Sequence, residues 1–472
     1  MKEDRTLVKL EANRAIVQRA CALLVCCSFL WPRALQAQAV ATSALVEQMQ
    51  RLVGKAGLGP KVALSVVDIA SGHVLLAHNA RTPLNPASNL KLLTASSAMI
   101  ELGPEFRSRT GVYGRVHDGA IEGGVCIKGQ GDPTLTRADL ITFAERLAAE
   151  GVHEVDEVAI DGSYFDSAIL PPAFDQQPNE VAPFRAAVGA VSVDANAYTL
   201  RVRPGATEGA PAFVSVDAPG YFDIDNGLTT SAQAGPSVVA TEHVIGDRIA
   251  LSLRGVLPLG AASLAYQRRV TSPLPYAGYL FIDALDALRI KAPKRVSIKS
   301  CPSDAPLIAF HSSAPLAELL TRLGKDSDNF VAEMILKTLG AERRRQPGTS
   351  SDGAAVVQAT LQRLNLPIEG LMMINGSGLF QGNRVTTDLL SSLLVAMYRN
   401  PSLRDDFVAD LAVGGVDGTL AKRFHNLPAP RIVRAKTGTL DDVIALSGYV
   451  LGPTADRAMA FSFLANGVTG KH

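Results

Sequence analysis

Three short motifs, each present once and in a fixed order, carry the side chains needed for acyl transfer through a covalent serine intermediate. They are Ser88-Asn89-Leu90-Lys91, Ser327-Asp328-Asn329 and Lys436-Thr437-Gly438. Together they supply a serine nucleophile, a lysine that can serve as its base, a second Ser/Asn pair and a further cation. Chance gives a chain of this composition roughly one Ser-x-x-Lys, so a single motif is weak evidence. Three motifs in one order favour a catalytic site.

The first motif is predicted to open a helix that runs from Ser88 to Leu102 and is closed by Gly103-Pro104. Side chains three residues apart share a helix face, so Ser88 and Lys91 meet. Lysine accepts a proton only when neutral, so its usual pKa of about 10.4 must fall through burial or a neighbouring cation such as Lys436. The alternative is a surface helix start with an exposed lysine.

The second motif lies on a connection between two predicted helices, where polar side chains can point into a cleft. We expect Ser327 to relay a proton between Lys91 and the leaving amine, and Asn329 to hold a substrate amide carbonyl. The alternative is a helix N-cap, which Ser, Asp and Asn all favour.

The third motif ends a predicted strand. Gly438 permits close approach of a substrate backbone, and an exposed strand edge can pair with a peptide, so we place Thr437 to Leu440 in the substrate site. The hydroxyls of Thr437 and Thr439, with Lys436, are expected to bind a terminal carboxylate. The backbone N–H groups of Ser88 and Thr439 are the expected oxyanion hole. The alternative is an ordinary strand end and turn.

Other catalytic templates do not occur in the sequence. It has no Gly-x-Ser-x-Gly, no His-Glu-x-x-His, no clustered Cys/His set and no phosphate-binding Gly-rich loop. We therefore expect neither a metal nor another cofactor. The 46 basic residues nearly equal the 45 acidic ones, which argues against a nucleic-acid partner.

The N-terminus is typical of a signal peptide over residues 1–39. Basic residues precede an apolar stretch from Ala20 to Trp31, and Ala37-Gln38-Ala39 supplies a small-x-small cleavage site. We expect an exported, periplasmic or extracytoplasmic protein without a transmembrane anchor after cleavage and with at most a loose membrane association. The alternative is an uncleaved anchor. Beyond this segment Cys126 and Cys301 remain, either as one disulfide or as two small buried side chains.

Periodicity predicts mixed α and β structure. Before residue 107 it indicates a helix over Val40–Val53 and a hairpin of Val62–Ile69 and His73–His78. The stretch from Arg109 to Ser300 is rich in Gly, Val and turn signals. Its predicted strands are Gly111–Val116, Gly124–Lys128, Val155–Ile160, Tyr198–Val202, Phe213–Val216, Arg248–Leu253 and Arg295–Lys299. Its predicted helices are Ala138–Glu150 and Tyr279–Leu288.

After Ser300 the helical pattern returns, and the chain ends in an antiparallel meander. The predicted helices are Pro315–Leu323, Asn329–Leu339, Gly353–Leu364 and Thr387–Arg399. The predicted strands are Pro430–Lys436, Val443–Val450 and Ala458–Phe463. A catalytic domain is therefore predicted from two separate stretches, residues 40–106 and 300–472.

From about Ala44 to Gly467 the chain resembles the class C low-molecular-mass penicillin-binding proteins, which are D-alanyl-D-alanine carboxypeptidases and endopeptidases. The three motifs carry the resemblance, and Ser327 follows Ser88 by 239 residues, a far larger gap than in the related β-lactamases. Further matching motifs are Asn85-Pro86-Ala87-Ser88, Gly131-Asp132-Pro133-Thr134-Leu135, Asn375-Gly376-Ser377-Gly378-Leu379, Val416-Asp417-Gly418-Thr419-Leu420 and Ser447-Gly448-Tyr449-Val450.

The resemblance implies an α/β (α+β) fold: a penicilloyl-serine transferase-like catalytic domain whose antiparallel sheet is flanked by helices and interrupted by inserted β-rich domains. It implies one insertion from residues 107–131 and 208–299, with a second nested at 132–207. By the family pattern Ser88 is the nucleophile and Lys91 its base, while Ser327, Asn329, Lys436, Thr437 and Thr439 line the site. The insertions are expected to shape substrate choice without supplying a catalytic side chain.

The implied function is cleavage of the terminal D-Ala-D-Ala bond or of D,D-cross-links, with peptidoglycan stem peptides as substrate partners and β-lactams as covalent inhibitors. Rival interpretations are a β-lactamase or D-amino-acid esterase and, outside the enzymes, an inactive penicillin-binding sensor of wall peptides. The chain departs from the family pattern at Asn375, where aspartate is usual, and little effect is expected there. It also ends at His472, where the family usually adds a helix, so we expect a version extended by such a helix to be more stable.

Overall fold

The computed structural model describes residues 47, 48, 50–52, 54, 55, 61–233, 235–425, 432–452, 454 and 457–468. The predicted signal peptide lies outside these residues. The helix predicted over Val40–Val53 falls mostly outside them, although residues 47, 48, 50–52, 54 and 55 are helical. From Lys61 onward the chain forms one compact unit. No helix in the described part of the chain has the length and apolar character required to cross a bilayer.

A six-stranded antiparallel sheet joins the two ends of this unit. Its strand order is β14-β15-β16-β17-β1-β2. The strand β17 (Met459–Asn466) pairs with β1 (Val62–Asp68), with Val62 opposite Ala465. The other strands are β2 (Val74–His78), β14 (Ala412–Val413), β15 (Ile432–Leu440) and β16 (Val443–Leu451). Two strands from the start of this unit and four from its end therefore form a single sheet.

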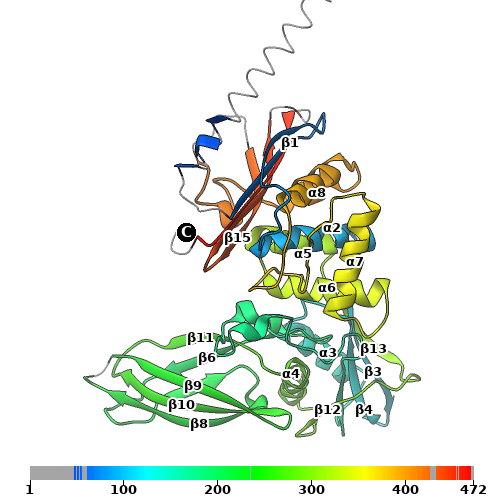
Figure 1. The fold of residues 1–472 in the computed structure, drawn as a ribbon. Helices are drawn as coiled ribbons and strands as arrows, with labels where there is room; N and C mark the ends of the chain where they lie inside the picture. The colour runs from blue at the N-terminus through cyan, green and yellow to red at the C-terminus, as the bar shows by residue number, and fades with distance from the viewer. Residues whose placement is uncertain are drawn as a thin grey trace, which may run out of the picture. The chain divides into compact units, whose positions relative to one another are not determined.

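Helices cover this sheet in a layer centred on α2 (Lys91–Leu102). This helix contacts α5, α6, α7 and α8, and α8 packs on β1, β16 and β17 (Figure 1). Every side chain from Lys91 to Met99 is buried, which agrees with the lack of charged residues over 92–100. The surrounding helices are α5 (Leu316–Thr321), α6 (Asn329–Arg343), α7 (Ser350–Arg363), α8 (Thr387–Arg399) and α9 (Arg404–Ala409).

The intervening residues build a separate five-stranded sheet with its own hydrophobic core. Its order is β12-β5-β4-β3-β13, and the helices α3 (Arg137–Ala149) and α4 (Pro273–Ala287) pack on it. The strands are β3 (Arg109–His117), β4 (Ala120–Gly129), β5 (Val158–Asp161), β12 (Val296–Ile298) and β13 (Leu307–Ser312). A disulfide between Cys126 on β4 and Cys301 ties the segment between β12 and β13 to this sheet, so the structure contains the bridge rather than two free cysteines.

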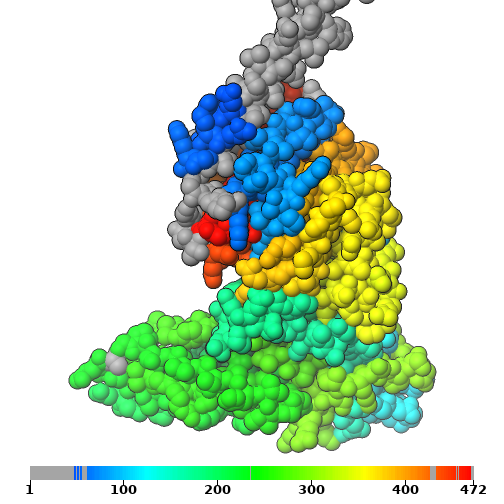
Figure 2. All heavy atoms as spheres, in the orientation of Figure 1, coloured from blue at the N-terminus to red at the C-terminus, as the bar shows by residue number. Residues whose placement is uncertain are grey.

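Two three-stranded sheets follow within residues 197–269, ordered β11-β6-β7 and β8-β10-β9. In the space-filling view these strands, coloured green, form one continuous surface (Figure 2). The strands are β6 (Ala197–Arg203), β7 (Phe213–Val216), β8 (Phe222–Ser231), β9 (Ser237–Ile245), β10 (Arg248–Pro258) and β11 (Leu264–Arg269). The boundaries of the nested insertion remain a prediction.

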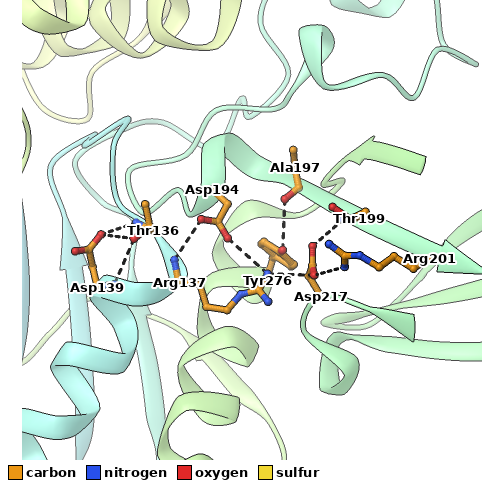
Figure 3. A network of polar contacts seen from close by, with 9 residues as sticks. All are labelled: Thr136, Arg137, Asp139, Asp194, Ala197, Thr199, Arg201, Asp217 and Tyr276. Carbon is orange, nitrogen blue, oxygen red and sulfur yellow. Dashed lines mark hydrogen bonds and ion pairs between the residues drawn. The ribbon is translucent and has the colours of Figure 1, made fainter. Parts of the chain in front are cut away.

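A polar network connects these strands to the start of α3 (Figure 3). The Arg137 guanidinium lies 3.6 Å from the Asp194 carboxylate and 3.5 Å from the Asp217 carboxylate. Asp217 also accepts the Thr199 N–H of β6 at 2.8 Å and pairs with Arg201. One carboxylate thus satisfies a backbone donor and two guanidinium groups, which fixes β6 against α3.

Candidate active site

Ser88 lies in a single 3-10 turn, η1 (Ala87–Leu90), and the α-helix begins only at Lys91. The predicted helix is therefore present, but its first turn is tighter than expected. The backbone of Ala87 has a φ of +45°, a left-handed conformation that a residue with a side chain adopts at a cost. Ser88 is half-buried on this strained turn, just before the N-terminus of α2, and the side chains from Lys91 to Met99 that follow it are buried.

Lys91 is at the centre of the site and is only 1% exposed. Its Nζ atom donates to Ser88 Oγ at 3.0 Å, to Asn329 Oδ1 at 2.7 Å and to the Ser377 carbonyl oxygen at 2.7 Å. Burial lowers the Lys91 pKa to about 7, although the carboxylates of Glu333 and Asp328 oppose the shift. The interpretation of an exposed surface lysine is excluded by this burial.

Lys436 is the second buried lysine of the site, with 0% exposure on β15. Its Nζ donates to the Thr437 carbonyl oxygen at 2.9 Å. Burial, and secondly the Lys91 charge, hold the Lys436 pKa well below its usual range. Burial rather than Lys436 is the main cause of the low Lys91 pKa. Two buried lysines that repel each other favour at least one neutral amine.

Strand β15 is held directly against the turn that carries the serine. A Cβ atom on Gly438 would lie 2.9 Å from the Pro86 carbonyl oxygen and 3.0 Å from the Ser88 nitrogen, so only glycine fits without displacement. We assign the Asn89 amide with its nitrogen toward the Lys436 carbonyl oxygen, at 2.7 Å, because its oxygen then faces the Ser447 N–H. Both contacts hold η1 against β15 and β16.

The outer edge of β15 is open where the substrate peptide is expected. Strand β14 pairs only with Arg434 and Ala435, so within the described residues no strand pairs with this edge from Lys436 to Leu440. Thr439 is exposed, Leu440 is half-buried, and the Thr437 hydroxyl donates to the Thr419 hydroxyl at 2.8 Å. An open strand edge beside a serine can accept an extended peptide.

The Ser327-Asp328-Asn329 motif has two different roles in local structure. Asp328 caps α6 by accepting the Val331 N–H at 3.1 Å, as the helix-cap alternative expects. Asn329 instead faces the site, with its oxygen at Lys91 and its nitrogen donating to the Phe184 carbonyl oxygen at 3.0 Å. Ser327 has a φ of +62° at the start of this turn, and nothing in the described part of the chain hydrogen-bonds to its hydroxyl.

Two groups of the site were not predicted from the sequence. They are the Ser377 carbonyl, which contacts Lys91, and the buried carboxylate of Glu333, which lies one turn after Asn329 on α6. A backbone carbonyl has no sequence signal. An acidic residue four positions after Asn329, on an otherwise apolar helix face, was a signal available for Glu333. Asn375 stabilises the local turn, because its Oδ1 accepts the Gly378 N–H at 3.0 Å and the Asn383 amide at 3.0 Å.

Comparisons with known proteins identify the family and support the fold of this chain. Residues 45–472 match the D-Ala-D-Ala carboxypeptidase 3 (S13) family. A D-alanyl-D-alanine carboxypeptidase of Actinomadura is 35% identical over 430 residues, covering 86% of this chain and 77% of that protein. The D-alanyl-D-alanine carboxypeptidase DacB of Haemophilus influenzae is 24% identical and covers 87% of both chains. The crystal structure of penicillin-binding protein 4 from that organism superposes with a TM-score of 0.73 at 24% identity, covering 86% of this chain and 90% of that one, which confirms the expected fold class.

Proposed function

We propose that this chain, which belongs to the D-Ala-D-Ala carboxypeptidase 3 (S13) family, is an exported serine D,D-peptidase with Ser88 as its nucleophile. The family identifies it as a serine hydrolase and confirms the resemblance to the low-molecular-mass penicillin-binding proteins. Its substrates are the terminal D-Ala-D-Ala bond or the D,D-cross-links of peptidoglycan stem peptides. β-Lactams are its covalent inhibitors.

The observation that carries the proposal is the set of three contacts around Lys91 Nζ. A neutral amine has two N–H bonds and one lone pair. Asn329 Oδ1 and the Ser377 carbonyl can only accept, so they take the two N–H bonds. The lone pair is then left for the third contact, Ser88 Oγ at 3.0 Å. With a pKa of about 7, roughly half of Lys91 is neutral at neutral pH and can take the serine proton.

We propose the following reaction, in which the contacts of Lys91 support the first proton transfer. Ser88 Oγ attacks the carbonyl carbon as its proton moves to Lys91, and the N–H groups of Ser88 and Thr439 stabilise the resulting oxyanion. Lys91 then returns the proton to the leaving amine by way of Ser327, which releases D-alanine and leaves the acyl group on Ser88. Water, deprotonated by Lys91, hydrolyses this ester and regenerates the serine.

The remaining predicted residues bind the substrate. Lys436 and the hydroxyls of Thr437 and Thr439 bind the terminal carboxylate, while the open edge of β15 pairs with the peptide through Gly438 and Leu440. The Asn329 nitrogen already donates to the Phe184 carbonyl oxygen. We therefore propose that Asn329 orients Lys91, and its contact with the substrate remains a prediction. Phe184 lies in the predicted insertion and contacts Asn329 through its backbone carbonyl.

Labelling with a fluorescent penicillin tests the nucleophile. Ser88→Ala should lose the label completely, and peptide mapping of the wild type should place the adduct on Ser88. Ser96→Ala, which removes a buried hydroxyl from the same helix, is the matched control and should keep the label. An adduct on Ser327 or Ser377 would contradict the assignment. Mass spectrometry of a digested muropeptide mixture then distinguishes carboxypeptidase from endopeptidase cleavage.

Turnover of a chromogenic cephalosporin tests the β-lactamase alternative. No glutamate in the chain has an asparagine four residues on, the spacing that places the deacylating base in class A β-lactamases. A tethered leaving group blocks the approach of water to the ester, so we expect stoichiometric inactivation with slow release. Many turnovers per second would favour a β-lactamase.

A further inference from the structure

Glu333 is a completely buried carboxylate on α6 that the proposed reaction does not yet use. It is 0% exposed, and within the described residues no lysine or arginine forms an ion pair with it. Both of its oxygens accept the Gly376 N–H at 3.0 Å, and Oε1 also accepts the Ser377 N–H at 2.7 Å. Burial raises the Glu333 pKa, whereas the N–H groups that meet both oxygens and the charge of Lys91 act in the opposite direction, so the hydrogen bonds favour the ionised carboxylate against the cost of burial. Burying an unpaired charge is unfavourable, so its presence requires a reason.

Gly376 and Ser377, whose N–H groups Glu333 holds, are also the two residues whose carbonyl oxygens face α2. The Gly376 carbonyl accepts the Thr94 hydroxyl at 2.8 Å, and the Ser377 carbonyl accepts Lys91 Nζ at 2.7 Å. The turn between Asn375 and Gly378 is thus fixed from two sides, by a carboxylate at its N–H groups and by α2 at its carbonyls. A shift of Glu333 must move the Ser377 carbonyl, because the same short turn carries both contacts.

We propose that Glu333 is a positioning residue for acylation, which holds the Ser377 carbonyl where it captures one N–H of neutral Lys91 and so directs the lone pair to Ser88. The inference rests on the proposed function and deepens it. Glu333 also supplies negative charge beside Lys91. It therefore sets both the orientation of the base and the pH at which the base becomes neutral.

The charges around the pair leave Glu333 as the dominant anion. Asp328 also faces Lys91, but Arg322 pairs with it at 2.7 Å, and the cation facing the pair from β15 is Lys436. Among the other charged groups on α6 and on the elements packed against it, Lys337 pairs with Asp166, Asp352 with Arg344 and Arg345, and Glu101 with Arg343 and Arg363. Arg185 donates to the carbonyl oxygens of Phe174 and Glu180. Loss of the Glu333 charge therefore lowers the Lys91 pKa further, since that charge favours the protonated amine.

The test is the rate of acylation of the full chain by a fluorescent penicillin, measured from roughly pH 5 to 10. In Glu333→Gln the plateau rate should fall about ten- to a hundredfold. Glutamine has a single acceptor oxygen, so it holds the Gly376 and Ser377 N–H groups, and with them the Ser377 carbonyl, less firmly. The acidic limb of the profile should move to lower pH by about one unit, because the neighbouring anion is gone. A residue with a purely structural role would change the amount of folded protein without moving this limb.

Two further variants separate position from charge. Glu333→Asp keeps the negative charge but has a shorter side chain. The acidic limb of the pH profile should therefore stay in place while the plateau rate of acylation falls. Glu342→Gln removes a carboxylate from the same helix, which accepts the Tyr164 hydroxyl and no other hydrogen bond within the described residues, and should alter neither quantity. If Glu333→Gln does not fold, the plateau of Glu333→Asp decides.

The inference would be overturned if folded Glu333→Gln had the plateau acylation rate and the acidic limb of the wild type. An unchanged plateau rate in Glu333→Asp would overturn it as well. A wild-type chain that fails to acylate at all would instead contradict the proposed function. The two failures are therefore distinguishable in one experiment.

Discussion

Replacing Lys91 with methionine should change how the stability of the fold depends on pH. Lys91 is 1% exposed, and burial lowers its pKa from 10.5 to about 7. In the unfolded chain the same lysine keeps its usual pKa. The folded protein therefore binds one proton fewer than the unfolded chain between about pH 7 and 10.5, and protons in this interval favour unfolding. Methionine has a similar length and does not titrate, so Lys91→Met removes this linkage.

The sign and size follow from that difference. Below about pH 7 both states of the wild type are protonated at Lys91, and its destabilising contribution is complete and constant. As the pH rises through the interval, the unfolding free energy of the wild type increases relative to Lys91→Met by about 1.4 kcal/mol per pH unit. Over the full separation of the two pKa values, the relative gain reaches at most about 5 kcal/mol. It levels off above about 10.5.

Urea unfolding of both proteins across this pH range measures the effect. A comparison at one pH is uninformative, because methionine also leaves Ser88, Asn329 and the Ser377 carbonyl without their donor. That loss is the same at every pH, so only the pH dependence of the difference reports the Lys91 titration. Lys436 titrates in both proteins, but the Lys91 charge contributes to its low pKa, so Lys91→Met raises the Lys436 pKa and the Lys436 contribution cancels only in part.

A pH-independent difference between the two proteins would refute the reasoning. It would mean that Lys91 has the same pKa in the folded and unfolded chains and is therefore protonated at neutral pH. Lys91 would then not be the base, even if Lys91→Met had lost acylation. A difference that changes in the opposite direction would mean that the neighbouring carboxylates outweigh burial.

Two further predictions follow from close contacts. Gly438→Ala should slow acylation by about ten- to a hundredfold and destabilise the fold by about 1–3 kcal/mol, because its Cβ would press on the Ser88 nitrogen. Gly235→Ala, which meets nothing within 4 Å, is the control, and equal penicillin-labelling rates in both variants would contradict the steric argument. Asp217→Ala should lower the free energy of unfolding by about 1–3 kcal/mol while leaving the labelling rate unchanged, since its network in Figure 3 contacts no site residue. Slower labelling of the folded variant would show that the network affects the site.

Elements that start at a capping or turn residue were predicted from the sequence with an accurate start. The predicted helix Asn329–Leu339 begins where α6 begins but ends four residues before it, and the predicted strand Val443–Val450 differs from β16 by one residue. Capping and turn residues mark these ends locally, so no distant contact is needed to find them. The same locality explains why Ser88 and Lys91 could be paired from their spacing.

Elements whose formation depends on distant partners were missed. The strand β13 is an edge strand that exists only because β3 lies beside it, and Leu307 and Phe310 on it remain exposed. The strand β9 is largely exposed, so its sequence lacks a clear buried face. The helix α4 was predicted to begin at Tyr279 but begins at Pro273. Proline is tolerated in the first turn of a helix, because the N–H that it lacks has no partner within the helix there.

For the site itself, the decisive property is burial of the helix that follows the serine. Ser-x-x-Lys on an exposed helix leaves the lysine protonated and inactive as a base. The helix α2 has no charged residue from Leu92 to Ile100, whereas an exposed amphipathic helix of that length needs a polar face. This pattern favours the buried interpretation from the sequence alone, because the polar side chains of the stretch are only the small hydroxyls of Thr94, Ser96 and Ser97. The buried position lowers the Lys91 pKa, and the fold accepts a less stable native state at neutral pH in return for a lysine that can act as a base.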